Sequence, residues 1–263
     1  RLCMDGNCAE NAMPDLKELS RPDGETIAYM AREGKLPGVV WLGGFKSEMH
    51  GTKAEALDGW AVREKRAFLR FDYFGHGRSS GDFRAGTISR WREDALAVLD
   101  RLTHGPQILV GSSMGGWLAL LLAQARPEKV AGLLLIAPAA DFTEALLWAR
   151  LPEEARREIM EEGEWQRPSA YDPEPYPITR KLIEDGRRHL VMGAPFRFRC
   201  PVRTLQGLED PDVPWEHALK LTRLIEGDVM LTLVNHGDHR LSTPENLLLI
   251  ERALDGLIAD VTK

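Results

Sequence analysis

Apolar and polar residues follow one another along this chain in a pattern that changes period several times. Short, continuous apolar runs, typical of strands buried on both faces, occur at residues 38–42, 67–71, 108–110, 130–137, 202–206 and 229–234. Segments with apolar residues at helical spacing lie between them, at 52–66, 89–102, 117–125, 215–226 and from 243 onward. This alternation predicts an α/β fold with right-handed crossovers and a mostly parallel central sheet flanked by helices.

Turn and cap residues refine the two ends of this pattern. Residues 16–20 and 25–32 alternate between apolar and polar, and the turn sequence Arg21-Pro22-Asp23-Gly24 separates them. We therefore expect an antiparallel hairpin at an edge of the sheet. Near the other end, Thr243 is expected to cap the final helix, with Pro244 at its first position.

The regular alternation stops between residues 141 and 199. Residues 153–164 are highly charged, and four prolines interrupt the chain at 168, 173, 175 and 177. A segment of this length and composition predicts short helices and proline corners that form a lid over an active-site mouth. The alternative is a surface excursion without a role in binding. The predicted division is a tail at 1–12, a core at 13–140 and 200–263, and an inserted lid at 141–199.

Size and charge exclude several classes of protein. A chain of 263 residues with 43% apolar and 28% charged residues can bury one large core. The net charge of −6 and the absence of a basic stripe argue against a nucleic-acid partner. No apolar run approaches the roughly 18 residues that a membrane-spanning helix needs.

The cysteines favour a reducing cytoplasm. There are three, Cys3, Cys8 and Cys200, and two of them lie in the tail, which has no hydrophobic segment of a secretory signal. The spacing of Cys3 and Cys8 lacks the partners of a zinc site, so we expect no metal. The tail is predicted to be disordered or foreign to the natural protein, with Met13-Pro14 as a plausible native start.

The candidate chemistry begins at residues 108–116, with the sequence I-L-V-G-S-S-M-G-G. A buried strand, a G-x-S-x-G turn and an apolar helix follow one another, which is typical of a nucleophile elbow. Gly111 and Gly115 flank Ser113 because Cβ atoms would collide in so tight a turn. The turn exposes the hydroxyl above the sheet edge, so Ser113 is the predicted nucleophile. The alternative is a Gly-Ser turn that only joins a strand to a helix.

A serine hydroxyl needs a base to accept its proton and an acid to orient that base. Asp210 and His239 follow two late strands, so a parallel sheet would bring both to the same edge as Ser113. The order Ser, Asp, His is that of the α/β-hydrolase arrangement. Position favours His239 over His236. The alternatives to Asp210 are Asp212 and, more weakly, Glu209.

The negative charge of a tetrahedral intermediate requires preorganised hydrogen-bond donors. The backbone amide of Met114, directly after the nucleophile, is one candidate, and the amide of Phe45, after the strand at 38–42, is the other. The alternative for Gly43-Gly44 is an ordinary tight turn. Three residues are expected to contact the substrate: Gly44, Trp148 and Val213.

Several stretches together resemble the α/β-hydrolase superfamily from about Met13 to the C-terminus. They are L-G-G-F-K-S-E-M-H-G-T-K (42–53), F-D-Y-F-G-H-G-R-S-S-G (71–81), G-P-Q-I-L-V-G-S-S-M-G-G-W (105–117), A-R-P-E-K-V (125–130), D-P-D-V-P-W (210–215) and H-G-D-H-R (236–240). Within the superfamily they are similar to the branch of palmitoyl-protein thioesterases that also deacylate acyl glucuronides, and to its bacterial relatives. The resemblance implies that Ser113 is the nucleophile, Asp210 the acid and His239 the base.

The function that follows is a serine hydrolase of carboxylic esters, and also of thioesters, working through an acyl-enzyme on Ser113. A carbon–carbon bond hydrolase or a perhydrolase could share the same three residues, and a non-catalytic binding protein could share the scaffold. A haloalkane dehalogenase is disfavoured because its nucleophile would be an aspartate at 113. We expect no cofactor, a small acyl ester or thioester as substrate, and a monomer or weak homodimer.

Overall fold

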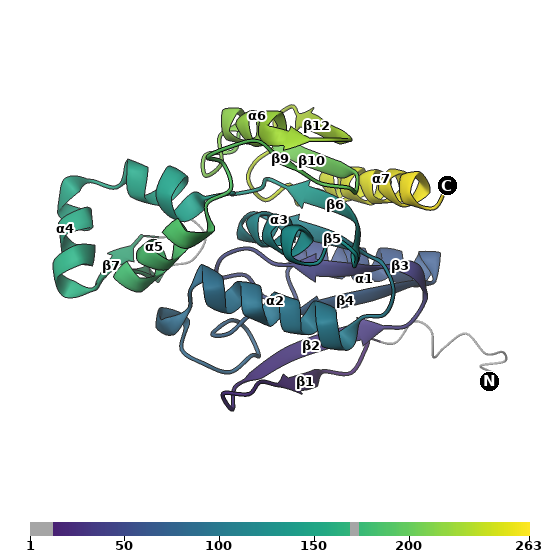
Figure 1. The fold of residues 1–263 in the computed structure, drawn as a ribbon, viewed down its shortest axis with the longest axis horizontal. Coiled ribbons are helices and arrows are strands. Elements are labelled where there is room, and N and C mark those ends of the chain that lie inside the picture. The colour runs from purple at the N-terminus through teal and green to yellow at the C-terminus, as the bar shows by residue number, and fades with distance from the viewer. Residues whose placement is uncertain (1–12, 169–173) are drawn as a thin grey trace.

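An eight-stranded sheet lies at the centre of the molecule (Figure 1). The computed structural model describes residues 13–168 and 174–263, so the predicted tail at 1–12, with Cys3 and Cys8, lies outside the described residues. The strand order is β1-β2-β4-β3-β5-β6-β10-β12. The strands are β1 (Lys17–Ser20), β2 (Thr26–Arg32), β3 (Lys35–Leu42), β4 (Arg66–Phe71), β5 (Gln107–Ser112), β6 (Val130–Ile136), β10 (Val202–Gly207) and β12 (Val229–Val234).

The direction of the strands matches the prediction from the sequence. Neighbouring strands from β4 to β12 pair in parallel, whereas β1 and β2 pair antiparallel and form the hairpin expected at one edge. Every residue of β5 is buried, as expected for a strand covered on both faces. The carboxyl ends of the parallel strands therefore share one edge of the sheet, where the loops of the candidate site lie.

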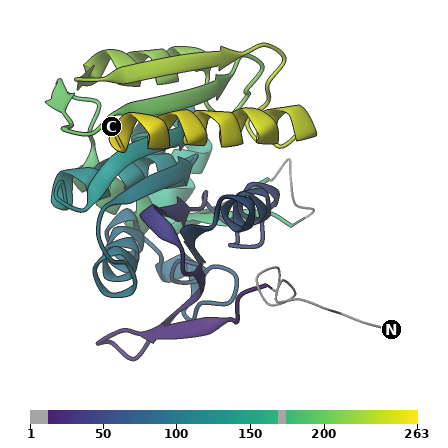
Figure 2. The ribbon, with the colours of Figure 1, turned by 90° about the vertical axis from the view of Figure 1, so that its right-hand side faces the viewer.

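Helices cover both faces of the sheet. One face packs against α2 (Ile88–Leu102), α3 (Met114–Ala125) and α6 (Trp215–Leu224), and the other against α1 (Thr52–Glu64) and α7 (Pro244–Val261). Figure 2 shows α7 lying along its face of the sheet. The side chain of Thr243 accepts a hydrogen bond from the amide of Asn246, which confirms it as the cap of α7, with Pro244 at the first position.

One helix boundary differs from the prediction. The helix expected at 215–226 ends at Leu224, and β11 (Ile225–Glu226) pairs in parallel with β9 (Phe196–Arg197). These two residues therefore belong to a strand and not to the helix. Ile225 pairs with Phe196 and Glu226 with Arg197, in a segment that lies 29 residues earlier in the chain. Such long-range pairing overrides the local helical spacing.

The segment at 141–199 forms a lobe beside the sheet edge, at the left in Figure 1. It contains the short helical turns η2 (Thr143–Leu147), η3 (Trp148–Arg150) and η4 (Arg187–His189), the helices α4 (Glu153–Glu162) and α5 (Arg180–Gly186), and the strands β7 (Glu164–Arg167) and β8 (Tyr176–Thr179). The antiparallel pairing of β7 with β8 was not predicted. The lobe has an apolar cluster of its own, made of Leu147, Leu151, Ala155, Ile159, Ile178 and Ile183.

Two carboxylates hold the base of this lobe, one by contacts within the lobe and one by contacts with the core. The carboxylate of Asp141, at its start, accepts hydrogen bonds from the amides of Val191 and Met192 near its end, at 2.8 and 2.9 Å. Asp185 of α5 accepts from the amide and the hydroxyl of Ser89 at the start of α2, both at 2.7 Å. The base of the lobe is therefore closed and held against the core.

Within the described residues, no helix has the length and apolar character to cross a bilayer.

Candidate active site

Ser113 lies in a sharp turn between β5 and α3, with φ 53° and ψ −118°. A Cβ atom at Gly111 would be 2.3 Å from the carbonyl oxygen of Gly115, and one at Gly115 would be 2.0 Å from the carbonyl oxygen of Leu42. Both distances are far below van der Waals contact. The two glycines are therefore required by the close approach of strand, turn and helix, and the positive φ of Ser113 is imposed by this packing.

A hydrogen-bonded series joins three loops at the carboxyl edge of the sheet. The Nε2 atom of His239 lies 3.0 Å from Oγ of Ser113, and its Nδ1 atom lies 2.8 Å from Oδ2 of Asp210. A carboxylate only accepts, so Nδ1 of His239 donates and Nε2 is free to accept the hydroxyl proton of Ser113. The Asp210 side chain is fully buried, while that of His239 is 15% exposed and reaches the solvent side.

Four donors surround the carboxylate of Asp210. Its Oδ1 accepts from the amides of Asp212 and Val213 at 2.9 and 2.8 Å. Its Oδ2 accepts from Nε2 of Gln206 at 3.0 Å, besides His239. All four partners are donors and a carboxylate only accepts, so this environment suits a buried acid that orients an imidazole.

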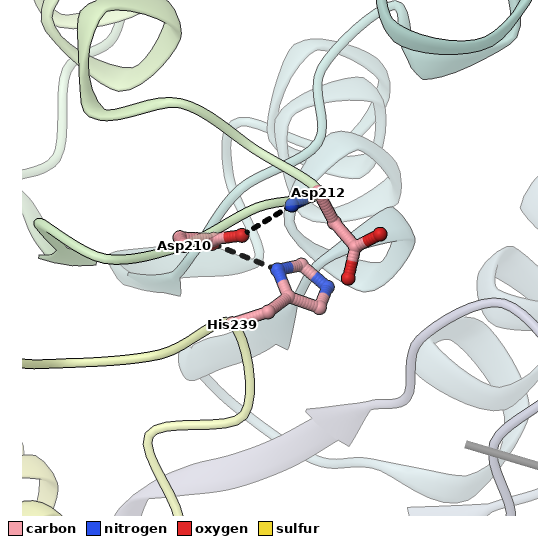
Figure 3. A group of neighbouring side chains, drawn as sticks. All are labelled: Asp210, Asp212 and His239. Carbon is pink, nitrogen blue, oxygen red and sulfur yellow. Dashed lines mark hydrogen bonds and ion pairs between the residues drawn. The ribbon is translucent and has the colours of Figure 1, made fainter. Parts of the chain in front are cut away.

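Of the other candidates, His236 and Glu209 lie at the surface, whereas Asp212 lies beside His239. His236 is 76% exposed and pairs with Glu209, whose carboxylate is 2.6 Å from its Nδ1. Figure 3 shows the ring of His239 between Asp210 and Asp212, with a dashed line from the ring to Asp210. The structure thus brings together Ser113, Asp210 and His239, and it turns His236 and Glu209 to the surface.

Asp210, Asp212 and His239 also form the group of metal-ligating side chains in the described part of the chain, with ligand atoms within 4.8 Å of one another. The donor set argues against a metal centre. Both oxygens of Asp210 already accept two hydrogen bonds each, and Nδ1 of His239 is bound to one of them. A metal ion would have to replace these contacts, so we assign no metal to this group.

A cavity of about 430 Å³ opens at Ser113 and His239. Apolar side chains from the lobe and from the loops form part of its wall: Phe45, Met114, Phe142, Leu146, Leu147, Tyr176 and Val213. Polar and basic side chains form another part: Lys46, Ser47, Glu48, Lys53, Arg167, Asp212, Arg240 and Ser242. The cavity therefore offers surfaces for both an apolar group and a polar one.

The three residues expected to contact substrate lie in different places. Gly44 and Val213 line the cavity. Trp148 is not part of its lining: the guanidinium groups of Arg187 and Arg156 lie over its ring, 5.1 and 5.6 Å from the centroid. The ring lies beside α4 and packs on the apolar cluster of the lobe, and its contact with the substrate stays a prediction.

The two predicted oxyanion donors come from different loops: Met114 directly follows the nucleophile, and Phe45 follows β3. Met114 is the first residue of α3, where backbone amides have no partner within the helix. Phe45 belongs to a turn in which the amide of Ser47 donates to the carbonyl of Gly44 at 3.1 Å. A Cβ atom at Gly44 would be 3.4 Å from Cβ of Ser113, so this turn lies against the nucleophile. The donor role of both amides stays a prediction.

Sequence reasoning missed two polar residues at the edge of this site. Lys53, in the first turn of α1, donates from Nζ to the carbonyl oxygen of Arg240, directly after His239. Burial, and secondarily the charge of Arg240, lowers the pKa of Lys53 to about 8. Burial likewise lowers the pKa of His76 to about 4. Their positions in the motifs at 42–53 and 71–81 were the available signal, but the spacing alone does not reveal their partners.

Comparison with known proteins adds to this geometry. The family model described as "Alpha/beta hydrolase family" matches residues 37–255. The chain belongs to the alpha/beta hydrolase family. Its mostly parallel sheet and flanking helices are thus the hydrolase architecture expected from the sequence.

Among relatives in this family, the mitochondrial palmitoyl-protein thioesterase ABHD10 of Mus musculus is 41% identical over 253 residues, 95% of this chain and 84% of that protein. The human protein of the same name is 40% identical, over 92% of this chain and 80% of its own. These homologues support a hydrolase. They are named as mitochondrial, so the cytoplasmic location expected for this hydrolase-family chain stays a prediction.

Solved structures agree. A crystal structure from Agrobacterium vitis S4 has a TM-score of 0.89 and 45% identity, covering 93% of this chain and 99% of that one. The mouse alpha/beta hydrolase domain-containing protein 10 has a TM-score of 0.87 and 40% identity, covering 94% and 99% of the two chains. The hydrolase fold therefore extends over nearly the whole chain, including the lobe.

Proposed function

We propose that this chain is a serine hydrolase that cleaves carboxylic esters and thioesters through an acyl-enzyme on Ser113. The observation that carries the proposal is the hydrogen-bonded series from Oγ of Ser113 to Nε2 of His239, at 3.0 Å, and from Nδ1 to Asp210, at 2.8 Å. The relatives named as palmitoyl-protein thioesterases support the thioester as a substrate class.

In the first half of the reaction, Oγ of Ser113 attacks the acyl carbon while Nε2 of His239 takes its proton. The carbonyl oxygen becomes negative and is bound by the amides of Met114 and Phe45. Collapse of this intermediate breaks the bond to the leaving alcohol or thiol, which receives the proton from His239. In the second half, water attacks the acyl-enzyme with His239 again as the base, and the acid and free serine are released.

The cavity walls support a division of the substrate. Phe142, Leu146 and Leu147 of the lobe provide an apolar surface for the acyl chain, and this is the role in which we propose the lobe as a lid. Lys53 and Arg240 lie at a polar part of the wall, suited to the leaving group. We therefore expect medium and long acyl chains to be cleaved faster than acetyl esters.

The test is hydrolysis of p-nitrophenyl esters and acyl-CoA thioesters of increasing chain length, by the native protein and by Ser113→Ala. We expect Ser113→Ala to lose at least about 1,000-fold in kcat/KM. A fluorophosphonate probe should attach to Ser113, and the adjacent Ser112→Ala variant should keep this label. Turnover that survives in Ser113→Ala would reject the proposal, as would a probe adduct on another residue.

A further inference from the structure

The turn that carries the proposed oxyanion donor Phe45 has an unusual backbone conformation. Lys46, its third residue, has φ 58°, and the amide of Ser47 closes the turn onto Gly44. A positive φ at the third position is the mark of a type II turn, which usually has glycine there. For another residue type this conformation is strained. A contact outside the turn must therefore favour it over type I, in which the Phe45–Lys46 peptide is reversed.

That contact is made by His76, which is only 4% exposed. Its Nε2 atom accepts a hydrogen bond from the amide of Lys46 at 3.1 Å. Its Nδ1 atom lies 3.1 Å from the carbonyl oxygen of Phe74, which also accepts from Nε1 of Trp91 at 3.0 Å. A carbonyl only accepts, so Nδ1 carries the proton and Nε2 is an obligatory acceptor. Because burial keeps this imidazole neutral at ordinary pH, the acceptor is always present.

Ring packing restrains both partners of this contact. The His76 ring packs edge-on against Phe83 and Trp91, with centroids 5.1 and 5.3 Å away. The Phe45 ring contacts the same two rings at 5.1 and 5.7 Å, and it contacts Phe142 and Tyr176 at 5.5 and 5.7 Å. The imidazole and the turn are thus held by one aromatic cluster, which also includes two residues of the lobe.

We propose that His76 is a positioning residue for the reaction: by accepting the Lys46 amide, it orients the Phe45–Lys46 peptide and thereby holds the Phe45 amide against Ser113. This inference rests on the proposed function, because it assigns a role to one of the oxyanion donors. The turn lies against the nucleophile at Gly44, where an added Cβ atom would be 3.4 Å from Cβ of Ser113. Loss of the contact should therefore weaken binding of the transition state more than binding of the substrate.

The experiment compares His76→Phe, which keeps a ring but cannot accept, with His76→Gln, whose side-chain carbonyl can accept. Each is assayed with p-nitrophenyl octanoate and with an octyl trifluoromethyl ketone, which forms a tetrahedral oxyanion on serine. For His76→Phe we expect kcat to fall about 10- to 100-fold, with KM changed less than about threefold and the ketone weakened in proportion to kcat. His76→Gln should recover most of this loss. His104→Ala, at an exposed histidine outside the site, is the matched control.

A double-mutant cycle separates orientation from general packing. Lys46→Gly adopts a positive φ without strain, so its turn needs less help from His76. The effect of His76→Phe on kcat should therefore be at least about threefold smaller in the Lys46→Gly background. Equal effects in both backgrounds overturn the proposal, and so does a folded His76→Phe variant with native kcat and ketone affinity. If the native protein itself cleaves no ester or thioester, the proposed function fails together with this inference.

Discussion

Replacement of Asp210 by asparagine changes one atom and the charge, and the structure defines what that atom would face. Both oxygens of Asp210 accept two hydrogen bonds, from the amides of Asp212 and Val213 on one side and from Gln206 and His239 on the other. The NH₂ group that replaces one carboxylate oxygen can only donate. The amides of Asp212 and Val213 are donors as well, so the NH₂ group cannot pair with them and must face Gln206 and His239.

His239 can adapt to this arrangement by moving its proton. With Nδ1 as an acceptor for the asparagine, Nε2 carries the hydrogen and donates to Oγ of Ser113, so it is no longer a base. Loss of the charged hydrogen bond costs about 1.5–3 kcal/mol, and restoring the productive tautomer against an unpaired donor costs about 2–3 kcal/mol more. At 1.36 kcal/mol per factor of ten, kcat should fall about 10³- to 10⁴-fold.

The assay is the hydrolysis of p-nitrophenyl octanoate at saturating substrate, together with urea unfolding of the same samples. Glu209→Gln is the matched control, because it removes a negative charge from the adjacent, exposed residue. It should keep kcat within about twofold. Asp210→Asn with kcat within tenfold of the native protein would refute the reasoning, provided that the unfolding curves show it to be folded.

Three further predictions concern stability. Gly115→Ala, whose new Cβ would lie 2.0 Å from a carbonyl oxygen of β3, should lower the free energy of unfolding by at least about 1–3 kcal/mol. Gly256→Ala, in α7, should raise the free energy of unfolding by about 0.5–1 kcal/mol, because its new Cβ would have no neighbour within 4 Å outside the helix backbone. Urea unfolding measures both changes. A Gly115→Ala variant as stable as the native protein would contradict the first prediction. Burial lowers the pKa of Lys53 from 10.5 to about 8, so between these values the unfolded state binds more protons and stability should rise with pH. Lys53→Met should lack this part of the rise in unfolding measured from pH 8 to 10, and an unchanged profile would show that Lys53 ionises alike in both states.

Local patterns were sufficient for most of the fold. The apolar runs at 38–42 and 108–110 lie within β3 and β5, and the cap at Thr243 starts the last helix where predicted. The positions of Ser113, Asp210 and His239 after three strands could also be located, because the carboxyl ends of parallel strands meet at one edge. These inferences succeed where one short segment carries enough periodicity or a sufficiently specific turn.

The lobe shows where local patterns fail. Its prolines and charges indicated an insertion, yet the hairpin of β7 and β8 and the contacts of Trp148 with Arg156 and Arg187 depend on packing between segments. The same is true of β11, whose two residues pair with β9 although their spacing favours a helix. These contacts stabilise pairs of segments that are distant in the chain, so neither segment alone has a sequence pattern that predicts them.

By itself, the sequence determined that the chain alternates strands with helices around a buried sheet, and that a tight glycine-flanked turn presents Ser113. Only the tertiary structure decided that His239 and Asp210 complete its hydrogen-bonded series while His236 and Glu209 pair at the surface. It also decided that His76, 30 residues from Lys46, accepts the amide beside Phe45. Periodicity encodes which face of an element is buried, whereas hydrogen bonds between loops depend on where the folded sheet places their ends.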